Sequence, residues 1–296
     1  MKKIIFMLAA AAMVVACEEL EQNLGAELGD STTEGTTDTT DDTTTDGTVT
    51  ELMFTTQINA LTKVTDTNFE SGDVIAVTAY DASGTLVSDA AQYTHNGSLF
   101  MSSAPIVYSG DDVTYSFYAV YPTVSSLQTS LDFYVETDQS SASAFTASDL
   151  LVASVSSSDA IPQLSFDHKM SSIVINIVGD VSGEATFSAK SGLRYGVKTG
   201  SMSALGSATT VTPLVYSDSL SMSCSVILAP QTVAMGSTLA TYTVGSLVYE
   251  WVLDTDFDMV SGKQYMFNWS LADREVTLVS VINGWDVVDG GTIESL

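Results

Sequence analysis

Basic residues are scarce in this sequence: nine Lys and Arg stand against 36 Asp and Glu, and the formal net charge is -27 at pH 7. A surface of that sign repels nucleic acids and anionic lipid headgroups, so DNA and RNA are excluded as partners. Cysteine is scarcer still, with only Cys17 and Cys224 in the chain. This pair supplies neither a disulfide framework nor the ligand spacing of a zinc site.

Histidine is also rare, and neither His95 nor His168 belongs to a catalytic motif. No Gly-x-Ser-x-Gly elbow accompanies them, and serine is so frequent that its positions carry little information. A Ser-His-Asp triad therefore has no support in the sequence. We interpret His168 as structural. The protein is predicted not to be an enzyme and to need no cofactor, and a hydrolase is the least supported alternative.

The first 17 residues have the features of an export signal. Lys2 and Lys3 precede an unbroken apolar run over residues 4–15, which is too short to span a membrane. Ala16 and Cys17 follow directly, and a small residue before a cysteine at this place resembles a lipobox. We therefore predict that residues 1–17 are a lipoprotein signal and that Cys17 receives the lipid. Several acyl chains on one residue would hold the protein in a bilayer.

Residues 18–48 are rich in Thr, Asp and Glu and contain almost nothing apolar. Such a segment cannot offset the entropy of ordering, and its like charges extend it. We predict a disordered acidic tether that lifts the folded part away from the membrane.

From Glu51 onward the sequence favours β-structure, because short runs of β-branched and aromatic residues alternate with Ser, Thr, Gly and Asp. No stretch of helical period is long enough to compete. The pattern is typical of antiparallel β-sandwiches with Greek-key connections. We predict one sandwich over residues 49–160 and a second over 161–296, with the boundary near Ser156–Asp159. The predicted strands are 73–80, 113–121, 131–135, 150–155, 172–178, 225–228, 247–253, 264–271 and 276–282.

A series of short motifs runs in order through nearly all of residues 51–293. Each is weak alone, and their order is what makes them specific. In chain order they are Phe54–Ile58, Thr62-Lys63, Phe69–Val77, Tyr121-Pro122, Asp149–Ala153, Leu164–Ser171, Pro230-Gln231, Gly262–Tyr265 and Trp285.

This series resembles the fimbrillin family of type V pilus subunits and Mfa-like outer-membrane lipoproteins. The resemblance implies two tandem transthyretin-like β-sandwiches and a role as a pilus subunit or adhesin on the cell surface. It also implies partners: other pilus subunits in a homo- or heteropolymer, and a host protein or glycan receptor. Glu18, Glu19 and Glu21 resemble the surface-export signal of such lipoproteins, which implies the outer face of the outer membrane, or a fimbrium after assembly.

In this family a trypsin-like protease cuts after a basic residue and removes the lipidated first strand. A strand of another subunit then fills the groove by donor-strand exchange, a form of β-augmentation. Lys63 is the only Lys or Arg between Lys3 and Lys169. The resemblance therefore implies cleavage between Lys63 and Val64, and the other interpretation is that Lys63 is a solvated loop charge.

The C-terminal residues give little support for a stalk role, because a stalk subunit needs a C-terminal extension that it can donate. Residues 286–296 are short and contain a Gly-Gly pair, so a donor strand would have to include 276–282 as well. Stalk, tip, anchor and stand-alone roles are all open at this point.

Two further sites are possible from residue type alone. Asp254, Asp256 and Asp258 alternate and could surround Ca²⁺, but the glycine and closing glutamate of an EF-hand are missing, which favours an ordinary acidic loop. A set of aromatic residues could stack on sugars, and the alternative function is then a monomeric surface lipoprotein that binds glycans for nutrient capture. The set is Tyr108, Tyr115, Tyr118, Tyr121, Phe133 and Tyr134.

Overall fold

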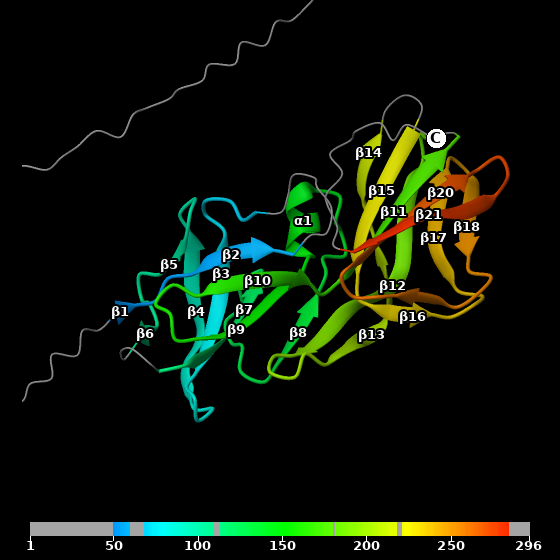
Figure 1. The fold of residues 1–296 in the computed structure, drawn as a ribbon. Coiled ribbons are helices and arrows are strands. Elements are labelled where there is room, and N and C mark those ends of the chain that lie inside the picture. Colours follow the sequence, from blue (N-terminus) through cyan, green and yellow to red (C-terminus); the bar gives the residue numbers. More distant parts are fainter. Residues whose placement is uncertain (1–49, 60–67, 109–112, 180, 218–220, 284–296) are drawn as a thin grey trace, which may run out of the picture. The chain divides into compact units, whose positions relative to one another are not determined.

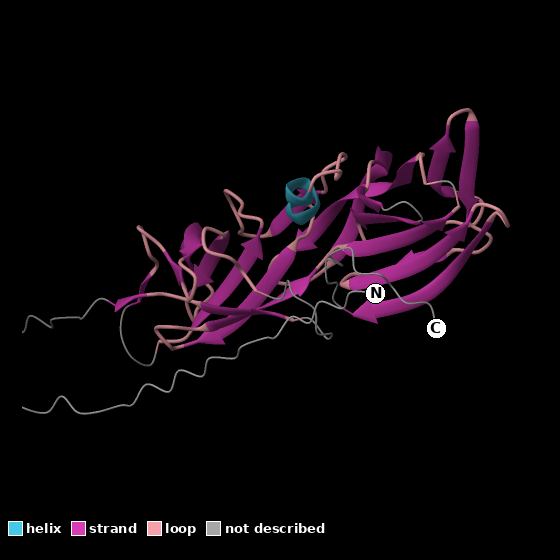
Figure 2. Ribbon diagram, turned by 90° about the horizontal axis from the view of Figure 1, so that it is seen from above, coloured by secondary structure: helices cyan, strands magenta, loops and turns pink. Residues whose placement is uncertain are grey.

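The computed structural model describes residues 50–59, 68–108, 113–179, 181–217 and 221–283 (Figure 1). These residues are mostly β-strand, with one short helix (Figure 2). Within the described ranges, no helix is both long enough and apolar enough to cross a bilayer. The predicted all-β class is confirmed at this level. The predicted signal segment and tether lie outside the described residues.

The first half is built on one sheet of seven strands in the order β2-β10-β9-β7-β3-β4-β5. An antiparallel bridge between Phe54 and Phe100, at the start of β5, nearly closes this sheet into a barrel. A β1-β6 pair flanks it. The elements are β1 (Thr50–Glu51), β2 (Thr55–Ile58), β3 (Val74–Tyr80), β4 (Leu86–His95), β5 (Phe100–Met101), β6 (Val107–Tyr108), β7 (Tyr115–Tyr121), β8 (Ser130–Tyr134), α1 (Ala142–Ala147), β9 (Leu151–Ser157) and β10 (Gln163–His168).

The second half has two facing sheets, in the orders β14-β15-β11-β20-β21 and β13-β12-β17-β18. Strand β8 of the first half pairs with β12 and so joins the second of these sheets. The strands are β11 (Ser171–Val178), β12 (Glu184–Gly196), β13 (Met202–Val211), β14 (Leu214–Ser217), β15 (Ser221–Leu228), β16 (Gln231–Val233), β17 (Thr238–Val244), β18 (Leu247–Val252), β19 (Phe257–Met259), β20 (Lys263–Ser270) and β21 (Glu275–Asn283).

Two of the strand pairs are parallel, whereas the sequence predicts antiparallel sheets throughout. Strand β2 runs parallel to β10, and β11 runs parallel to β20. Parallel neighbours need a long crossover connection, and here each pair joins strands that are far apart in sequence. Strand β10 also pairs with β9, so the strand that follows the predicted boundary belongs to the sheet of the first half. The domain division itself stays a prediction.

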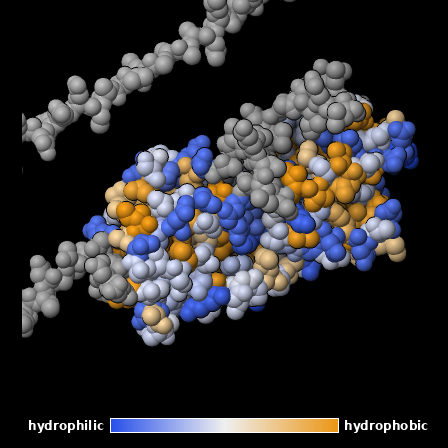
Figure 3. Space-filling view, in the orientation of Figure 1, coloured by the Kyte–Doolittle hydropathy of each residue, from blue (hydrophilic) through white to orange (hydrophobic). Residues whose placement is uncertain are grey.

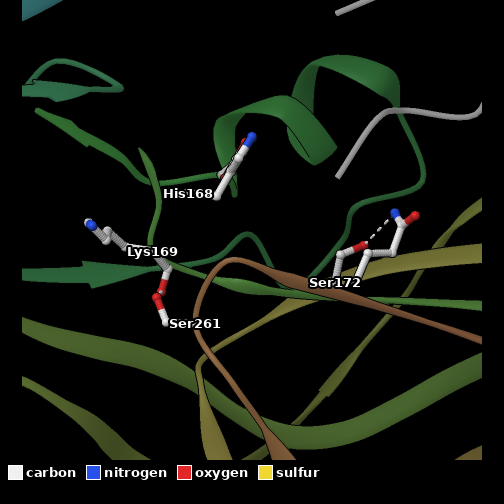
Figure 4. A network of polar contacts seen from close by, with 6 residues as sticks. His168, Lys169, Ser172 and Ser261 are labelled. Atoms are coloured by element: carbon white, nitrogen blue, oxygen red, sulfur yellow. Dashed lines mark hydrogen bonds and ion pairs between the residues drawn. The ribbon is translucent and has the colours of Figure 1, made fainter. Parts of the chain in front are cut away.

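The buried side chains form three clusters. One lies in the first half, one between the two sheets of the second, and the third takes residues from both halves, including Val120 and Leu193. The short link between β10 and β11 is also bonded on both sides. The Lys169 amide donates to the Leu150 carbonyl at 2.8 Å, and the Ser261 hydroxyl donates to the Lys169 carbonyl at 3.0 Å (Figure 4). The described residues from 50 to 283 thus form one compact unit.

Asp89 organises the loop that follows β7. Its carboxylate accepts hydrogen bonds from the Leu127 amide at 2.7 Å and from the Ser126, Gln128 and Thr78 side chains at 2.8 to 3.2 Å. Partial burial raises the pKa of Asp89, but these hydrogen bonds to the charged form outweigh it, and the net shift of the pKa is downward.

The sign of this shift gives a pH prediction. A folded pKa below the unfolded value of about 3.9 stabilises the fold above that pH, and this stability is lost as the pH falls through the folded pKa. We expect Asp89→Asn to lower the free energy of unfolding by about 1–2 kcal/mol at neutral pH. The difference from the parent should shrink below about pH 4. Urea unfolding at neutral and acidic pH measures this, and an equal difference at both would contradict it.

Candidate functional site

The first described segment, residues 50–59, lies in a slot between two parts of the first sheet (Figure 1, blue). On one flank, the Leu52 amide donates to the Ile106 carbonyl, and Phe54 exchanges both backbone hydrogen bonds with Phe100, at 2.9 to 3.2 Å. On the other flank, the Met53 amide donates to the Ala160 carbonyl at 3.2 Å. Strand β2 then continues beside β10 in parallel register. We call this position the first-strand slot, defined by residues 100–106 on one side and 160–166 on the other.

The segment also supplies the centre of the first hydrophobic cluster. Leu52 and Phe54 are 1% and 0% exposed. The Phe54 ring meets the Tyr93 ring edge-on at 4.9 Å between centroids and the Phe117 ring at 5.4 Å. Edge-to-face contacts of this kind add to the free energy of burial itself. The polar side chain of Gln57 is exposed, so the segment has the alternation of a strand with one buried face.

The predicted processing and anchoring residues lie outside the described part of the chain. Cys17 precedes it, and Lys63 and Val64 fall between Asn59 and Asn68. The amide of Asn59 donates to the Phe166 carbonyl at 2.7 Å, so the slot segment is bonded up to its last described residue. Lipidation of Cys17 and cleavage after Lys63 stay predictions.

Among the described strands, β21 is the edge of its sheet and pairs only with β20. Leu278, Val279 and Val281 are 50%, 54% and 43% exposed. Figure 3 shows hydrophobic surface in the region where β20 and β21 lie in Figure 1. An apolar edge strand with a single partner is an open site for pairing with another chain.

A cavity of about 260 Å³ brings together polar residues that are distant in sequence. His168 Nδ1 lies 2.7 Å from Asp149 Oδ2. The Tyr121 hydroxyl donates to Asp73 at 3.2 Å, and the Glu70 amide donates to the other oxygen of Asp73 at 2.8 Å. Burial, and then the nearby Asp73 carboxylate, raise the pKa of Tyr121 to about 12. The tyrosine therefore stays protonated and acts as a donor, and these contacts fix the turn before β3 and the end of β10.

Two of the three candidate calcium ligands accept hydrogen bonds from the neighbouring segment 232–235, and Asp254 accepts one from the adjacent Thr255 hydroxyl at 3.5 Å. Asp256 accepts from the Met235 amide at 2.8 Å, and Asp258 accepts from the Thr232 hydroxyl at 2.5 Å. In the described ranges, no group of three or more His, Cys, Asp and Glu side chains is placed to hold a metal ion.

The aromatic set does not form one exposed strip in the part of it that the structure describes. Tyr115 is buried, whereas Tyr118, Tyr121 and Phe133 are half-buried. Tyr134 is 58% exposed. The sequence missed Tyr93, whose ring forms a wall of the slot. The sequence signal for Tyr93 is that Ala91, Tyr93 and His95 alternate with polar residues. This alternation is weak because β4 is rich in small and polar residues.

The match to a family profile covers most of the chain. The profile described as Fimbrillin-like matches residues 62–285. No protein with a curated description matches.

Solved structures share the fold. A Bacteroides ovatus protein assigned to cell adhesion is 18% identical, with a TM-score of 0.65, over 80% of this chain and 99% of that one. A Bacteroides uniformis protein with the same assignment is 20% identical, with a TM-score of 0.59, over 79% of this chain and 98% of that one. At such identities the likeness establishes the fold.

Proposed function

This chain belongs to the fimbrillin-like family, and from that premise we propose that it is a cell-surface fimbrial subunit or adhesin without a catalytic role. Cys17 anchors it to the outer membrane through lipid. A protease cuts after Lys63, and a strand from another pilus subunit then takes the place of the first strand. The two halves act as tandem transthyretin-like sandwiches, one of which holds the exchanged strand.

The observation that carries this proposal is the first-strand slot. The segment that fills it contributes buried side chains and bonds to both flanks, so its departure would open a groove with free backbone groups on either side. An incoming strand would recover those hydrogen bonds and refill the core, which is the physical basis of β-augmentation. The segment's covalent connection to the rest of its sheet runs through residues 60–67, which contain Lys63.

Strand β21 supports a role for the other end of the chain. Its detachment would break the described ladder with β20, and its insertion into the groove of another subunit would bury apolar side chains that are half-exposed in the monomer. A subunit that accepts a strand at the slot and also donates β21 to a neighbour would occupy an internal position in a polymer. A subunit that only accepts a strand would occupy a terminal position.

The test is limited trypsin digestion of residues 18–296, which lack the lipidated cysteine. We expect a main product that begins at Val64, together with exchange of the released fragment for a fluorescently labelled peptide of residues 49–59. Mass spectrometry and fluorescence anisotropy measure the two steps. The matched variant Lys63→Gln should show neither cleavage at this position nor exchange of the labelled peptide. The proposal fails if Lys63 is cut but the labelled peptide never enters, or if Lys63 resists cleavage while the fold stays intact.

A further inference from the structure

We infer that the strand which replaces the first strand comes from a different kind of subunit and carries a large aromatic residue at the position of Phe54. This inference rests on the proposed function, because it concerns the strand that enters the same slot. It names the chemistry of that partner: an extended segment with an aliphatic residue, then any residue except proline, and then phenylalanine.

The pocket that holds Phe54 has fixed aromatic walls. Tyr93, Phe100 and Phe117 are at most 1% exposed. The Tyr93 hydroxyl accepts a hydrogen bond from the Ile106 amide at 2.8 Å, which holds the ring in place from its far end. A pocket whose walls are held in this way cannot collapse onto a smaller side chain, so a smaller residue would leave a cavity.

The backbone of the slot fixes the register of whatever fills it. Leu52, Met53 and Phe54 each donate their amide to a carbonyl of one flank or the other. Proline cannot supply such a donor, so it is excluded at these three positions. Because alternate residues of a strand share a face, the aliphatic residue and the aromatic residue must lie two positions apart.

The chain's own C-terminal strand does not meet this requirement. Val276, Leu278 and Val281 of β21 pair with Trp269, Phe267 and Tyr265, so they lie on the same face of the sheet as those rings. None of these three donor candidates is aromatic.

The rest of the C-terminal sequence offers no better match. In residues 275–296 the only aromatic residue is Trp285, and the residue two positions before it is Asn283. A strand laid in the direction of β2 would therefore place an amide where Leu52 is buried. Burial of a polar side chain without a partner opposes binding. Residues 275–296 and the slot are thus not complementary, which favours a strand from a different kind of subunit at this joint.

The experiment measures which peptides enter the slot of the full 18–296 chain after cleavage at Lys63. The probes are the native peptide of residues 49–59, the same peptide with Phe54→Leu or Phe54→Tyr, and a peptide of residues 275–296. We expect Phe54→Leu to bind at least about tenfold more weakly. The Phe54→Tyr peptide should also bind more weakly than the native one, because its hydroxyl would be buried without a partner, and the 275–296 peptide should not compete. The matched control is Gln57→Ala, an exposed change on the same strand, which should bind within about twofold.

The outcomes separate this inference from the proposed function. Equal binding of the native and Phe54→Leu peptides would overturn the aromatic requirement and leave strand exchange intact. Tight binding of the 275–296 peptide, in either direction, would overturn the heteropolymer, as would filaments formed by the cut chain alone in electron microscopy. Failure of the native peptide itself to enter would remove both conclusions.

Discussion

Replacement of Phe54 by alanine should lower the free energy of unfolding by about 3–5 kcal/mol. The side chain is fully buried and its ring contacts Tyr93 and Phe117 edge-on. Its loss removes the burial of the ring and leaves a cavity, because the surrounding rings are held by their own strands. Urea unfolding followed by far-UV circular dichroism measures the change.

The matched control for this variant is Gln57→Ala on the same segment. Gln57 is exposed, and within the described part of the chain its side chain bonds to Asn59 and Gln163 near the surface. Its replacement should change the free energy of unfolding by no more than about 0.5 kcal/mol. If Phe54→Ala lowered the free energy of unfolding as little as this control, the segment would not be an integral part of the core. The slot would then no longer be supported as a site for strand exchange.

The sequence predicts strands well where alternation is strong. All nine predicted strands are present, and most shift by no more than two residues at either end. The family motif at Phe54–Ile58 marks the segment that contains β2, and the hydrophobic alternation of this segment is visible once Leu52 and Phe54 are seen as one face. What the sequence could not give is the identity of its neighbours, because the pairing between β2 and β10 joins residues 108 positions apart.

Strand β12 shows where prediction fails. It is 13 residues long, yet it was not predicted, because Ser, Lys and Gly interrupt its apolar residues. Tertiary contact overrides that weak local preference, since β8, β13 and β17 all pair with it. Gly192 shows the cost of its position: a Cβ there would lie 2.6 Å from the Tyr134 ring. Gly192, one of the small residues that weaken the strand pattern, therefore allows β8 to pair closely alongside β12.

Gln139 was missed for a different reason, since it lies in an irregular segment and no pattern marks it. Its side chain is fully buried, and it is bonded to a strand 88 positions away. The amide nitrogen donates to the Ile227 carbonyl at 2.8 Å, and the amide oxygen accepts from the Ile227 amide at 2.9 Å. The side chain thus pairs with the backbone of β15 as a neighbouring strand would. Only the folded structure brings these groups together.

Gln139→Leu is therefore expected to lower the free energy of unfolding by about 2–4 kcal/mol, because it leaves both backbone groups of Ile227 buried without partners. Leucine has a similar volume, so lost packing contributes little. Hydrogen exchange gives a local readout: the Ile227 amide should lose protection more than amides in the centre of β15. Gln163→Leu is the matched control, since Gln163 is exposed at the start of β10, and its effect should stay within about 0.5 kcal/mol. If Ile227 kept its protection in the Gln139 variant, the amide would not be the link between residues 136–139 and β15. The coupling of the two halves would then rest on the β8-β12 ladder and the shared core.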